Sequence, residues 1–184
     1  MLSGKKILLC VCGGVAAYKA ADLTRQLRKA GAKVQVAMTA SALQFVGAAT
    51  FQALSGQPVR ISLWDAQAEA AMGHIELARW PDAIVIAPAT ANTLAKLAHG
   101  LADDLVSTLC LASTAPILAA PAMNQRMWLH PATQANIALL QSRGLAMVGP
   151  ACGEQACGEQ GPGRMSEPFE IVAALNAMLG EVRA

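Results

Sequence analysis

The sequence predicts an α/β protein whose single domain contains a doubly wound parallel sheet. Apolar runs of strand length recur along the chain, and segments with apolar residues at helical spacing follow them. Strands that alternate with helices are typical of parallel sheets covered on both faces. A length of 184 residues fits one domain. No interdomain linker or long-period repeat interrupts the pattern, so we assign residues 1–184 to one domain.

The first predicted unit is a strand, a helix and a second strand. Residues 6–12 form a continuous apolar run, Gly13 and Gly14 turn the chain, and apolar residues then recur at helical spacing. Gly31 occupies the position after this helix, where glycine is favoured. Residues 34–38 form a second strand that hardly alternates, because both of its faces would be covered. These elements predict a right-handed βαβ crossover.

The same alternation continues through the rest of the chain. Further strands are expected at residues 82–90, 115–123 and 145–149, and further helices at residues 91–100, 131–144 and 167–179. Two regions interrupt it, residues 55–75 and residues 149–166, and both are rich in Gly, Pro and polar residues. Loops of this length inside a compact domain are usually functional or disordered.

The composition excludes several classes of function. Of the residues, 54% are hydrophobic and only 14% are charged, against roughly 25% charged in an ordinary domain, so we expect surface buried against other subunits. A net charge of +2 with scattered basic residues does not predict a nucleic-acid partner. No apolar run reaches the roughly 18 residues of a membrane helix. The five cysteines form no disulfide framework, which favours reduced thiols in the cytoplasm.

Small and hydroxyl residues follow three of the predicted strands, at the edge where parallel sheets bind ligands. They are Gly13, Gly14 and Val15, then Thr39 and Ser41, and finally Thr90, Ala91, Asn92 and Thr93. Small residues before a helix let a phosphate approach the helix N-terminus. The pattern is neither G-x-G-x-x-G nor a P-loop, and hydroxyls stand where a dinucleotide site has an acid. FMN therefore fits better than NAD, although ordinary helix caps would explain each segment singly.

Five motifs then occur in a characteristic order: GGVAAYK, AMGHIEL, APATANTLAK, APAMNQRMW and ACGEQGPGRM. In this order the chain closely resembles the phosphopantothenoylcysteine decarboxylases, within the family of homo-oligomeric flavin-containing cysteine decarboxylases. The resemblance spans roughly the whole chain and implies a Rossmann-like flavodoxin-type fold, bound FMN, and homotrimers or multiples of trimers. In bacteria this domain is usually fused to a phosphopantothenoylcysteine synthetase. The sequence leaves open whether the chain is free-standing or half of such a protein.

The resemblance implies the conversion of 4′-phosphopantothenoylcysteine to 4′-phosphopantetheine in coenzyme A biosynthesis. Direct loss of CO₂ would leave a carbanion without an electron sink. Oxidation of the thiol by FMN to a thioaldehyde supplies the sink, and the enethiol left after CO₂ loss is then reduced again. The alternatives are a related peptidyl-cysteine decarboxylase and a non-catalytic flavin-binding regulatory subunit.

By the family match, His74 is the catalytic base, Asn124 holds the substrate carboxylate and Cys157 donates a proton. A loop histidine is more often a surface residue, and asparagine is well suited to cap a helix, so both side chains have an alternative interpretation. The repeat ACGEQ-ACGEQ contains two cysteines in the same local setting. Only Cys157 leads into GPGRM at the family's spacing, and we expect Cys152 to be a bystander.

The resemblance assigns further residues around these three. Ser107 and Ala122 are expected to bind the cofactor with the strand-end residues. Asn124, Met127, Ala156, Gly158 and Arg164 are expected to bind the substrate. Residues 149–166 are expected to form a flexible clamp, which Arg164 fixes after closure, although an ordinary exposed turn would also fit this composition. No metal is expected, because Cys152 and Cys157 lack a second suitably spaced pair of ligands.

Overall fold

The computed structural model describes residues 2–64 and 73–181. Its main sheet has five parallel strands in the order β2-β1-β3-β4-β5, which is the order of flavodoxin-type doubly wound sheets. The predicted fold class is therefore confirmed. The strands are β1 (Lys6–Val11), β2 (Lys33–Met38), β3 (Ala83–Ala89), β4 (Ile117–Pro121) and β5 (Ala146–Met147).

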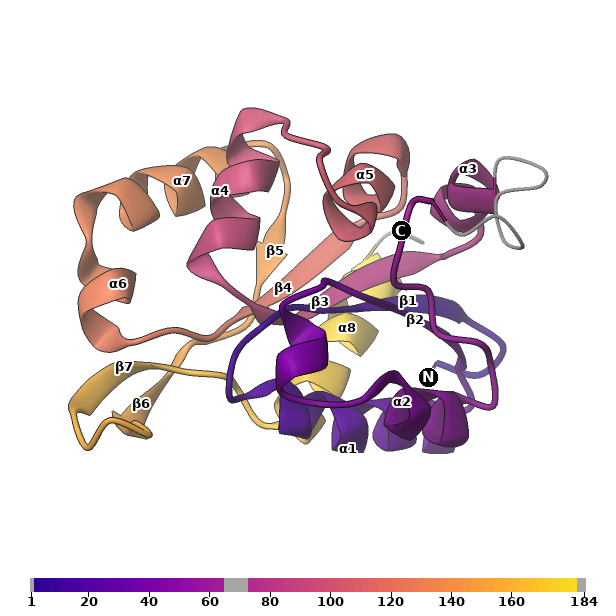
Figure 1. The fold of residues 1–184 in the computed structure, drawn as a ribbon, viewed down its shortest axis with the longest axis horizontal. Coiled ribbons are helices and arrows are strands. Elements are labelled where there is room, and N and C mark those ends of the chain that lie inside the picture. The colour runs from indigo at the N-terminus through magenta and orange to yellow at the C-terminus, as the bar shows by residue number, and fades with distance from the viewer. Residues whose placement is uncertain (1, 65–72, 182–184) are drawn as a thin grey trace.

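Helices cover both faces of this sheet (Figure 1). One face packs against α1 (Ala17–Lys29), α2 (Ala48–Ser55) and α8 (Pro168–Glu181). The other face packs against α3 (Gly73–Arg79), α4 (Ala91–His99), α5 (Leu105–Ala112) and α7 (Pro131–Ser142). The short helices η1 (Ala42–Gln44) and α6 (Gln125–Leu129) follow β2 and β4. No helix in the described part of the chain is long and apolar enough to cross a membrane.

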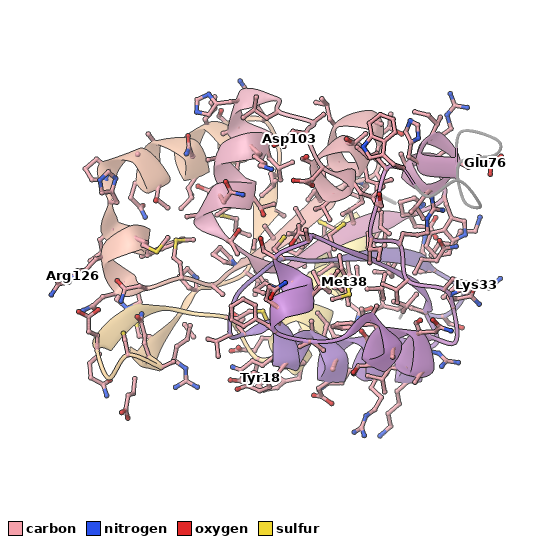
Figure 2. The ribbon with its side chains drawn as sticks, viewed as in Figure 1. Tyr18, Lys33, Met38, Glu76, Asp103 and Arg126 are labelled. Carbon is pink, nitrogen blue, oxygen red and sulfur yellow. The ribbon has the colours of Figure 1, made fainter. Side chains whose placement is uncertain are left out.

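The first strand shows why its sequence does not alternate between apolar and polar residues. Ile7 and Leu9 pack into the core beneath α1 and α8, whereas Leu8 and Cys10 pack into the core beneath α4 and α5. All four side chains are fully buried. In β2 the buried Met38 points into the molecule and Lys33 lies at the surface (Figure 2). A strand covered on both faces needs apolar residues at every position.

The segment 149–166 differs from the predicted loop. It contains an antiparallel hairpin of β6 (Ala151–Glu154) and β7 (Gln160–Arg164), which forms a second sheet of its own. Both strands are short and rich in glycine, so the sequence shows none of the alternation by which strands are recognised. The hairpin lies beside α6, at the end of the molecule away from α3 (Figure 1).

The other interrupted segment, residues 55–75, is only partly described, and its residues 65–72 lie outside the described range. Before that gap, the backbone of Arg60 accepts a hydrogen bond from Met38 and donates one to Val36, both at 2.9 Å. After it, His74 lies in the first turn of α3 and not in a loop. The sequence patterns also did not reveal α2 and α5, which are short and rich in small or β-branched residues.

Candidate active site

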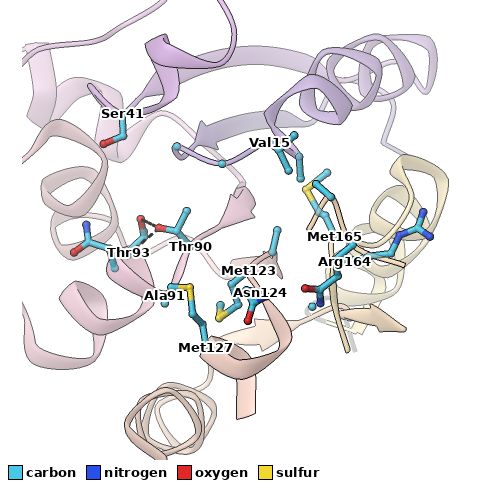
Figure 3. Close-up of a pocket in the computed structure, with 18 of the residues that line it drawn as sticks. Val15, Ser41, Thr90, Ala91, Thr93, Met123, Asn124, Met127, Arg164 and Met165 are labelled. Carbon is cyan, nitrogen blue, oxygen red and sulfur yellow. Dashed lines mark hydrogen bonds between the residues drawn. The ribbon is translucent and has the colours of Figure 1, made fainter. Parts of the chain in front are cut away.

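A cavity of about 970 Å³ opens at the carboxyl ends of the strands, between the sheet edge and the hairpin (Figure 3). Its lining contains all three of the predicted strand-end segments. They are Gly13, Gly14 and Val15, Thr39 and Ser41, and Thr90, Ala91, Asn92 and Thr93. Ala122, Asn124, Met127, Ala156 and Cys157 line the same cavity from β4, α6 and the hairpin. Three segments far apart in the sequence thus form one site.

The turn after β1 lies directly against the turn after β2. A Cβ atom on Gly13 would stand 2.3 Å from the Cβ of Ser41 and 2.7 Å from its carbonyl carbon, so only glycine fits there. A Cβ atom on Gly14 would have Thr90 Cγ2 as its nearest neighbour, at 4.0 Å. Helix α1 then begins at Ala17, after the N-cap residue Ala16, and no side chain caps its N-terminus. In this first turn the N–H of Ala17 donates to the carbonyl of Gly14 at 2.9 Å and that of Lys19 to the carbonyl of Ala16 at 3.0 Å. The helix dipole still favours an anion at this end.

The hydroxyl residues have local hydrogen-bonding roles as well. Thr90 caps α4, because its Oγ1 accepts the N–H of Thr93 at 3.2 Å, and the two hydroxyl oxygens are 3.0 Å apart. Thr39 accepts the N–H of Ala42 at 3.3 Å. In the neighbouring turn after β1, burial raises the pKa of the Cys12 thiol to about 12, although a hydrogen bond with Thr93 opposes the shift. Cys12 is therefore a neutral thiol at physiological pH.

An ion pair and a helix cap close one wall of the cavity. Lys96 Nζ lies 2.7 Å from a carboxylate oxygen of Asp103 and 2.7 Å from one of Asp104. Asp104 also caps α5 and accepts the N–H of Ser107 at 2.9 Å. Burial alone would raise the pKa of Asp104, but the contacts with Lys96 and Ser107 outweigh it and lower the pKa. The same carboxylates raise the pKa of Lys96.

Asn124 joins the end of β4 to the hairpin. Its Oδ1 accepts the backbone N–H of Arg126 at 2.8 Å and so caps α6. Its Nδ2 donates to Glu159 Oε2 at 2.7 Å and lies 3.4 Å from Cys157 Sγ. The two interpretations of Asn124 are therefore compatible, because its oxygen caps the helix while its nitrogen points toward the predicted proton donor.

The hairpin packs closely on the segment before α6. The backbone N–H of Met123 donates to the carbonyl of Gly163 at 3.0 Å, and a Cβ atom on Gly163, whose φ is +144°, would stand 2.2 Å from Met123 O. Gln155 adds two links: its Oε1 accepts the N–H of Gln125, and its Nε2 donates to the carbonyl of Pro162, both at 3.0 Å. Backbone contact without intervening side chains requires glycine here.

Several predicted site residues do not face the cavity. His74 lies on α3 and is partly buried, and it is not among the lining residues. Ser107 is 1% exposed, and its hydroxyl serves the cap of α5 by donating to the carbonyl of Asp104 at 3.1 Å. Gly158 forms the hairpin turn, where its N–H donates to Gln155 O at 2.8 Å. Their functional roles stay predictions.

Arg164 and Cys152 have a different position from the other hairpin residues. Arg164 borders the cavity, but its guanidinium points away from it (Figure 3) and lies 3.9 Å from the carboxylate of Glu167. Cys152 is exposed on β6 and is not a lining residue, whereas Cys157 is both exposed and part of the lining. The two copies of the repeat thus differ in whether their cysteine lines the cavity, and the roles of the two cysteines stay predictions.

Sequence reasoning did not single out three residues that shape this site. Lys19 is 9% exposed, and its Nζ donates to Glu167 at 2.5 Å and to the carbonyl of Met165 at 3.3 Å, which ties α1 to the segment after β7. Gln155 and Glu159 fix the hairpin as described above. Lys19 belongs to the motif GGVAAYK, and Gln155 and Glu159 belong to the ACGEQ repeat. Their place in a motif does not reveal which residues they contact.

Within residues 2–64 and 73–181, no three His, Cys, Asp or Glu side chains are grouped so that they could hold a metal ion. The five cysteines are free. The fold and the cavity define the class of protein: a doubly wound α/β domain with a mononucleotide-sized site at the carboxyl edge of its sheet. The sequence matches the flavoprotein family over residues 1–180, and the chain belongs to this family.

Curated relatives within this family are bifunctional coenzyme A biosynthesis proteins named CoaBC. The protein of Vibrio vulnificus strain YJ016 is 58% identical over 172 residues, which cover 94% of this chain and 43% of the relative. The protein of Escherichia coli strain K12 is 56% identical over 171 residues, which cover 93% of this chain and 42% of the relative. The chain thus spans less than half the length of these relatives.

Solved structures of similar proteins share the fold over nearly their whole length. A cysteine-to-serine mutant of PPC decarboxylase, complexed with pantothenoylaminoethenethiol, has a TM-score of 0.84 and 34% identity, and the match covers 96% of this chain and 99% of that one. The FMN binding protein AtHal3 has a TM-score of 0.82 and 34% identity, with 96% and 97% covered. The FMN-dependent cysteine decarboxylase SpaF has a TM-score of 0.80 and 31% identity, with 95% and 99% covered.

Proposed function

We propose that this domain binds FMN in the cavity and decarboxylates 4′-phosphopantothenoylcysteine to 4′-phosphopantetheine. The observation that carries the proposal is the position of the Asn124 amide, 3.4 Å from the Cys157 thiol at a cavity suited to a mononucleotide. A donor for a carboxylate and a donor for a proton thus lie together beside the cofactor site. Membership of the flavoprotein family and the likeness to PPC decarboxylase support the same activity.

The residues around the cavity fit FMN. Its volume of about 970 Å³ lies within the roughly 300–1,000 Å³ of small-molecule sites. The uncapped N-terminus of α1 would hold the phosphate, and Gly13 and Gly14 leave room for it. The hydroxyls of Ser41 and Thr90 lie at the same edge and would hold polar groups of the cofactor. When bound, FMN supplies the reversible two-electron oxidation of the substrate thiol that decarboxylation needs.

Asn124 is the residue that we propose to anchor the substrate carboxylate. The hydrogen bond from Arg126 N–H fixes its Oδ1, so the Nδ2 donor keeps its direction toward the hairpin. A carboxylate held at Nδ2 lies beside the hairpin and the cavity, where the bond to CO₂ can be aligned for cleavage. An amide with a fixed orientation positions the leaving group without adding a charge that would have to be desolvated.

Cys157 is the residue that we propose to donate the final proton. Its Sγ lies next to the carboxylate anchor, so the proton is close to the carbon from which CO₂ has departed. The hairpin holds Cys157 through its contacts with α6 and the preceding segment. The same contacts exclude water from one side of the substrate, which protects a reactive enethiol from unwanted protonation.

We propose that His74 acts in the cavity of a neighbouring copy, within a homotrimer or a multiple of trimers. In its own chain His74 lies on α3, outside the cavity lining. Beside the cavity, Val15 and Tyr18 are 60% and 62% exposed although both are apolar, and Met127 is 50% exposed. Large exposed apolar side chains at a rim are typical of a surface that another subunit covers. A head-to-tail trimer would bring one such surface to each site.

The substrate implies a partner activity and a compartment. A phosphopantothenoylcysteine synthetase, fused or separate, would supply the substrate, and the bifunctional relatives support such a pairing. The cytoplasm suits a protein with five free cysteines, two of them exposed.

The proposal is tested by incubating the purified, flavin-loaded protein with 4′-phosphopantothenoylcysteine. We expect bound FMN in the absorption spectrum, released CO₂ and a product with the mass of 4′-phosphopantetheine. A peptide with a C-terminal cysteine serves as the comparison substrate and is expected to react far more slowly. Absence of flavin would refute the cofactor assignment. Bound flavin without turnover of either substrate would support a regulatory flavin-binding subunit instead, and faster turnover of the peptide would support a peptidyl-cysteine decarboxylase.

A further inference from the structure

We propose that Glu159 is a displaceable latch: its carboxylate occupies Asn124 in the ligand-free protein and gives way to the carboxylate of the substrate. The inference rests on the proposed function, because it takes Asn124 as the substrate's carboxylate anchor. It adds that the protein contains its own carboxylate for this anchor. The hairpin is therefore held to Asn124 by Glu159 when no substrate is bound. When substrate is bound, its carboxylate takes that place.

The side chain of Asn124 can offer only a limited number of hydrogen-bond donors. A side-chain amide has two N–H groups and no more. One points to Glu159 Oε2 at 2.7 Å, and the other contact of Nδ2 is Cys157 Sγ at 3.4 Å. The amide cannot turn over without losing the hydrogen bond from Arg126 N–H to Oδ1. A substrate carboxylate can take the N–H that now binds Glu159 only if Glu159 moves away, because the other N–H already faces Cys157.

Glu159 has further partners besides Asn124, and its Oε2 also lies 3.9 Å from Cys157 Sγ. Its Oε1 lies 3.2 Å from Nε of Arg126, at the outer edge of the molecule beside the hairpin (Figure 2). The side chain of Arg126 is 83% exposed and can follow a moving carboxylate, whereas that of Glu159 is 29% exposed. When Glu159 leaves Asn124, it therefore retains an ionic partner. The exchange replaces one carboxylate by another and leaves no charge buried without a partner.

The product lacks the group that Asn124 would hold in the substrate. 4′-Phosphopantetheine has lost the carboxylate, so it cannot hold the Nδ2 donor of Asn124. Glu159 then binds Asn124 again, and the product no longer stabilises the closed hairpin at this position. The latch thus distinguishes substrate from product by the group that the reaction removes, and it favours release after turnover.

The test uses the flavin-loaded protein and the variants Glu159→Gln and Glu159→Ala. The matched control is Glu154→Gln, which removes the same charge from β6. Glu154 is exposed and borders the same cavity, so it matches Glu159 in charge near the ligand, but its carboxylate makes no hydrogen bond or ion pair with a described residue. In the ligand-free protein, we expect amide hydrogen exchange in residues 155–163 to become about threefold to tenfold faster in both Glu159 variants and to stay unchanged in Glu154→Gln. Unchanged exchange in both Glu159 variants would overturn the latch.

Ligand affinity then tests the displacement. One probe is the serine analogue of the substrate, which keeps the carboxylate but lacks the thiol, and the other is 4′-phosphopantetheine. We expect Glu159→Ala to bind the serine analogue about threefold to tenfold more tightly and the product less than twofold differently. Equal effects on both probes, or equal tightening in Glu154→Gln, would show general charge repulsion and refute the displacement. If the parent protein binds neither probe, the proposed function fails, and hydrogen exchange alone decides whether Glu159 closes the hairpin.

Discussion

The side-chain nitrogen of Asn124 lies 3.4 Å from the sulfur of Cys157, although the two residues are 33 positions apart in the chain. One belongs to the segment between β4 and α6, and the other to the turn of the β6–β7 hairpin. The contact joins the rigid edge of the main sheet to a separate small sheet. The proposed carboxylate anchor and the proposed proton donor thus lie beside different sheets, an arrangement that would suit a site that closes over its substrate.

The two cysteines of the repeat are expected to behave differently when each is replaced by serine. Cys157→Ser should still release CO₂ but accumulate the unreduced enethiol, which is lighter than the normal product by two hydrogens, because the donated proton is missing. Cys152→Ser should resemble the parent, because this exposed side chain does not line the cavity. Mass spectrometry of the product distinguishes them. If the two phenotypes are exchanged, the assignment of Cys157 is wrong.

Asn124→Asp is expected to abolish substrate anchoring without unfolding α6. Aspartate retains an oxygen that can accept the Arg126 N–H, and it caps helices as well as asparagine does. It loses both N–H donors and places a negative charge beside Glu159 and the substrate carboxylate. We expect kcat/KM to fall by about 10²-fold or more, with a melting temperature within a few degrees of the parent. A variant that keeps more than a tenth of the parental kcat/KM would contradict the anchor.

The two glycines after β1 are expected to respond in different ways to alanine. In Gly13→Ala the new Cβ overlaps Ser41, so the turns after β1 and β2 must separate, and we expect a loss of about 2–4 kcal/mol in unfolding free energy. In Gly14→Ala the new Cβ meets its nearest neighbour at 4.0 Å. The protein should fold normally, but the methyl group reduces the room for the cofactor phosphate. Thermal unfolding and the flavin-to-protein absorbance ratio measure both effects, and normal stability of Gly13→Ala would contradict the close packing.

The ion pair at Lys96 predicts a dependence of stability on acid. Because the pKa of Asp104 is lowered in the folded state, its ionised form stabilises the fold at pH above about 4. That contribution is lost as pH falls through the ordinary and then the lowered pKa. Asp104→Asn should therefore be less stable than the parent by about 1 kcal/mol at pH 7 and converge with it in strong acid. Denaturant unfolding at several pH values measures the difference.

The control for this prediction is Asp103→Asn. Asp103 contacts the same Lys96 at 2.7 Å, but its side chain is 66% exposed, and Asp104 is the residue that caps α5. We expect a smaller effect on unfolding free energy, because exposed ion pairs contribute little. If the two variants lose the same unfolding free energy, the stabilisation comes from the charge and not from the cap.

A shared site predicts complementation between two inactive variants. His74→Asn and Asn124→Asp should each be inactive alone. If His74 acts in a neighbouring copy, random mixing in a ring of identical subunits leaves about a quarter of the sites with both native residues. Co-expression should then restore activity toward that fraction, measured as CO₂ release per flavin. If the mixed protein stays inactive, His74 and Asn124 act within the same copy. Activity of His74→Asn alone would instead show that His74 is dispensable.

Much of the sheet could be predicted from the sequence, because the relevant signals are local. The apolar run at residues 6–12 became β1, Lys6–Val11, and the helical spacing after Gly14 became α1. The strand-end residues could also be grouped in advance, since all strands of a parallel sheet end at the same edge. Their convergence on one cavity follows from this topology.

The hairpin and the position of His74 could not be predicted in the same way. Short glycine-rich strands such as Gln160–Arg164 show no alternation, and their pairing depends on contacts with Met123 and Gln155 that lie outside them. The resemblance assigns a role to His74, but it does not show whether His74 acts in its own subunit or in a neighbouring one. Two side-chain partners of Glu159, Asn124 and Arg126, come from α6 and the segment before it, so the place of Glu159 at Asn124 is visible only in three dimensions.

Among the described residues, the two strands of the hairpin pair only with each other and have no hydrogen-bonded strand neighbour in the main sheet. Changes near the tip of the hairpin would therefore leave the hydrogen bonds between the strands of the main sheet intact and alter only the part of the cavity wall that the hairpin forms. Under the proposed function, such changes would alter which thiol-containing acid is accepted, while the strand-end residues proposed to hold FMN stay unchanged. The hairpin is in this sense the evolvable part of an otherwise conservative scaffold.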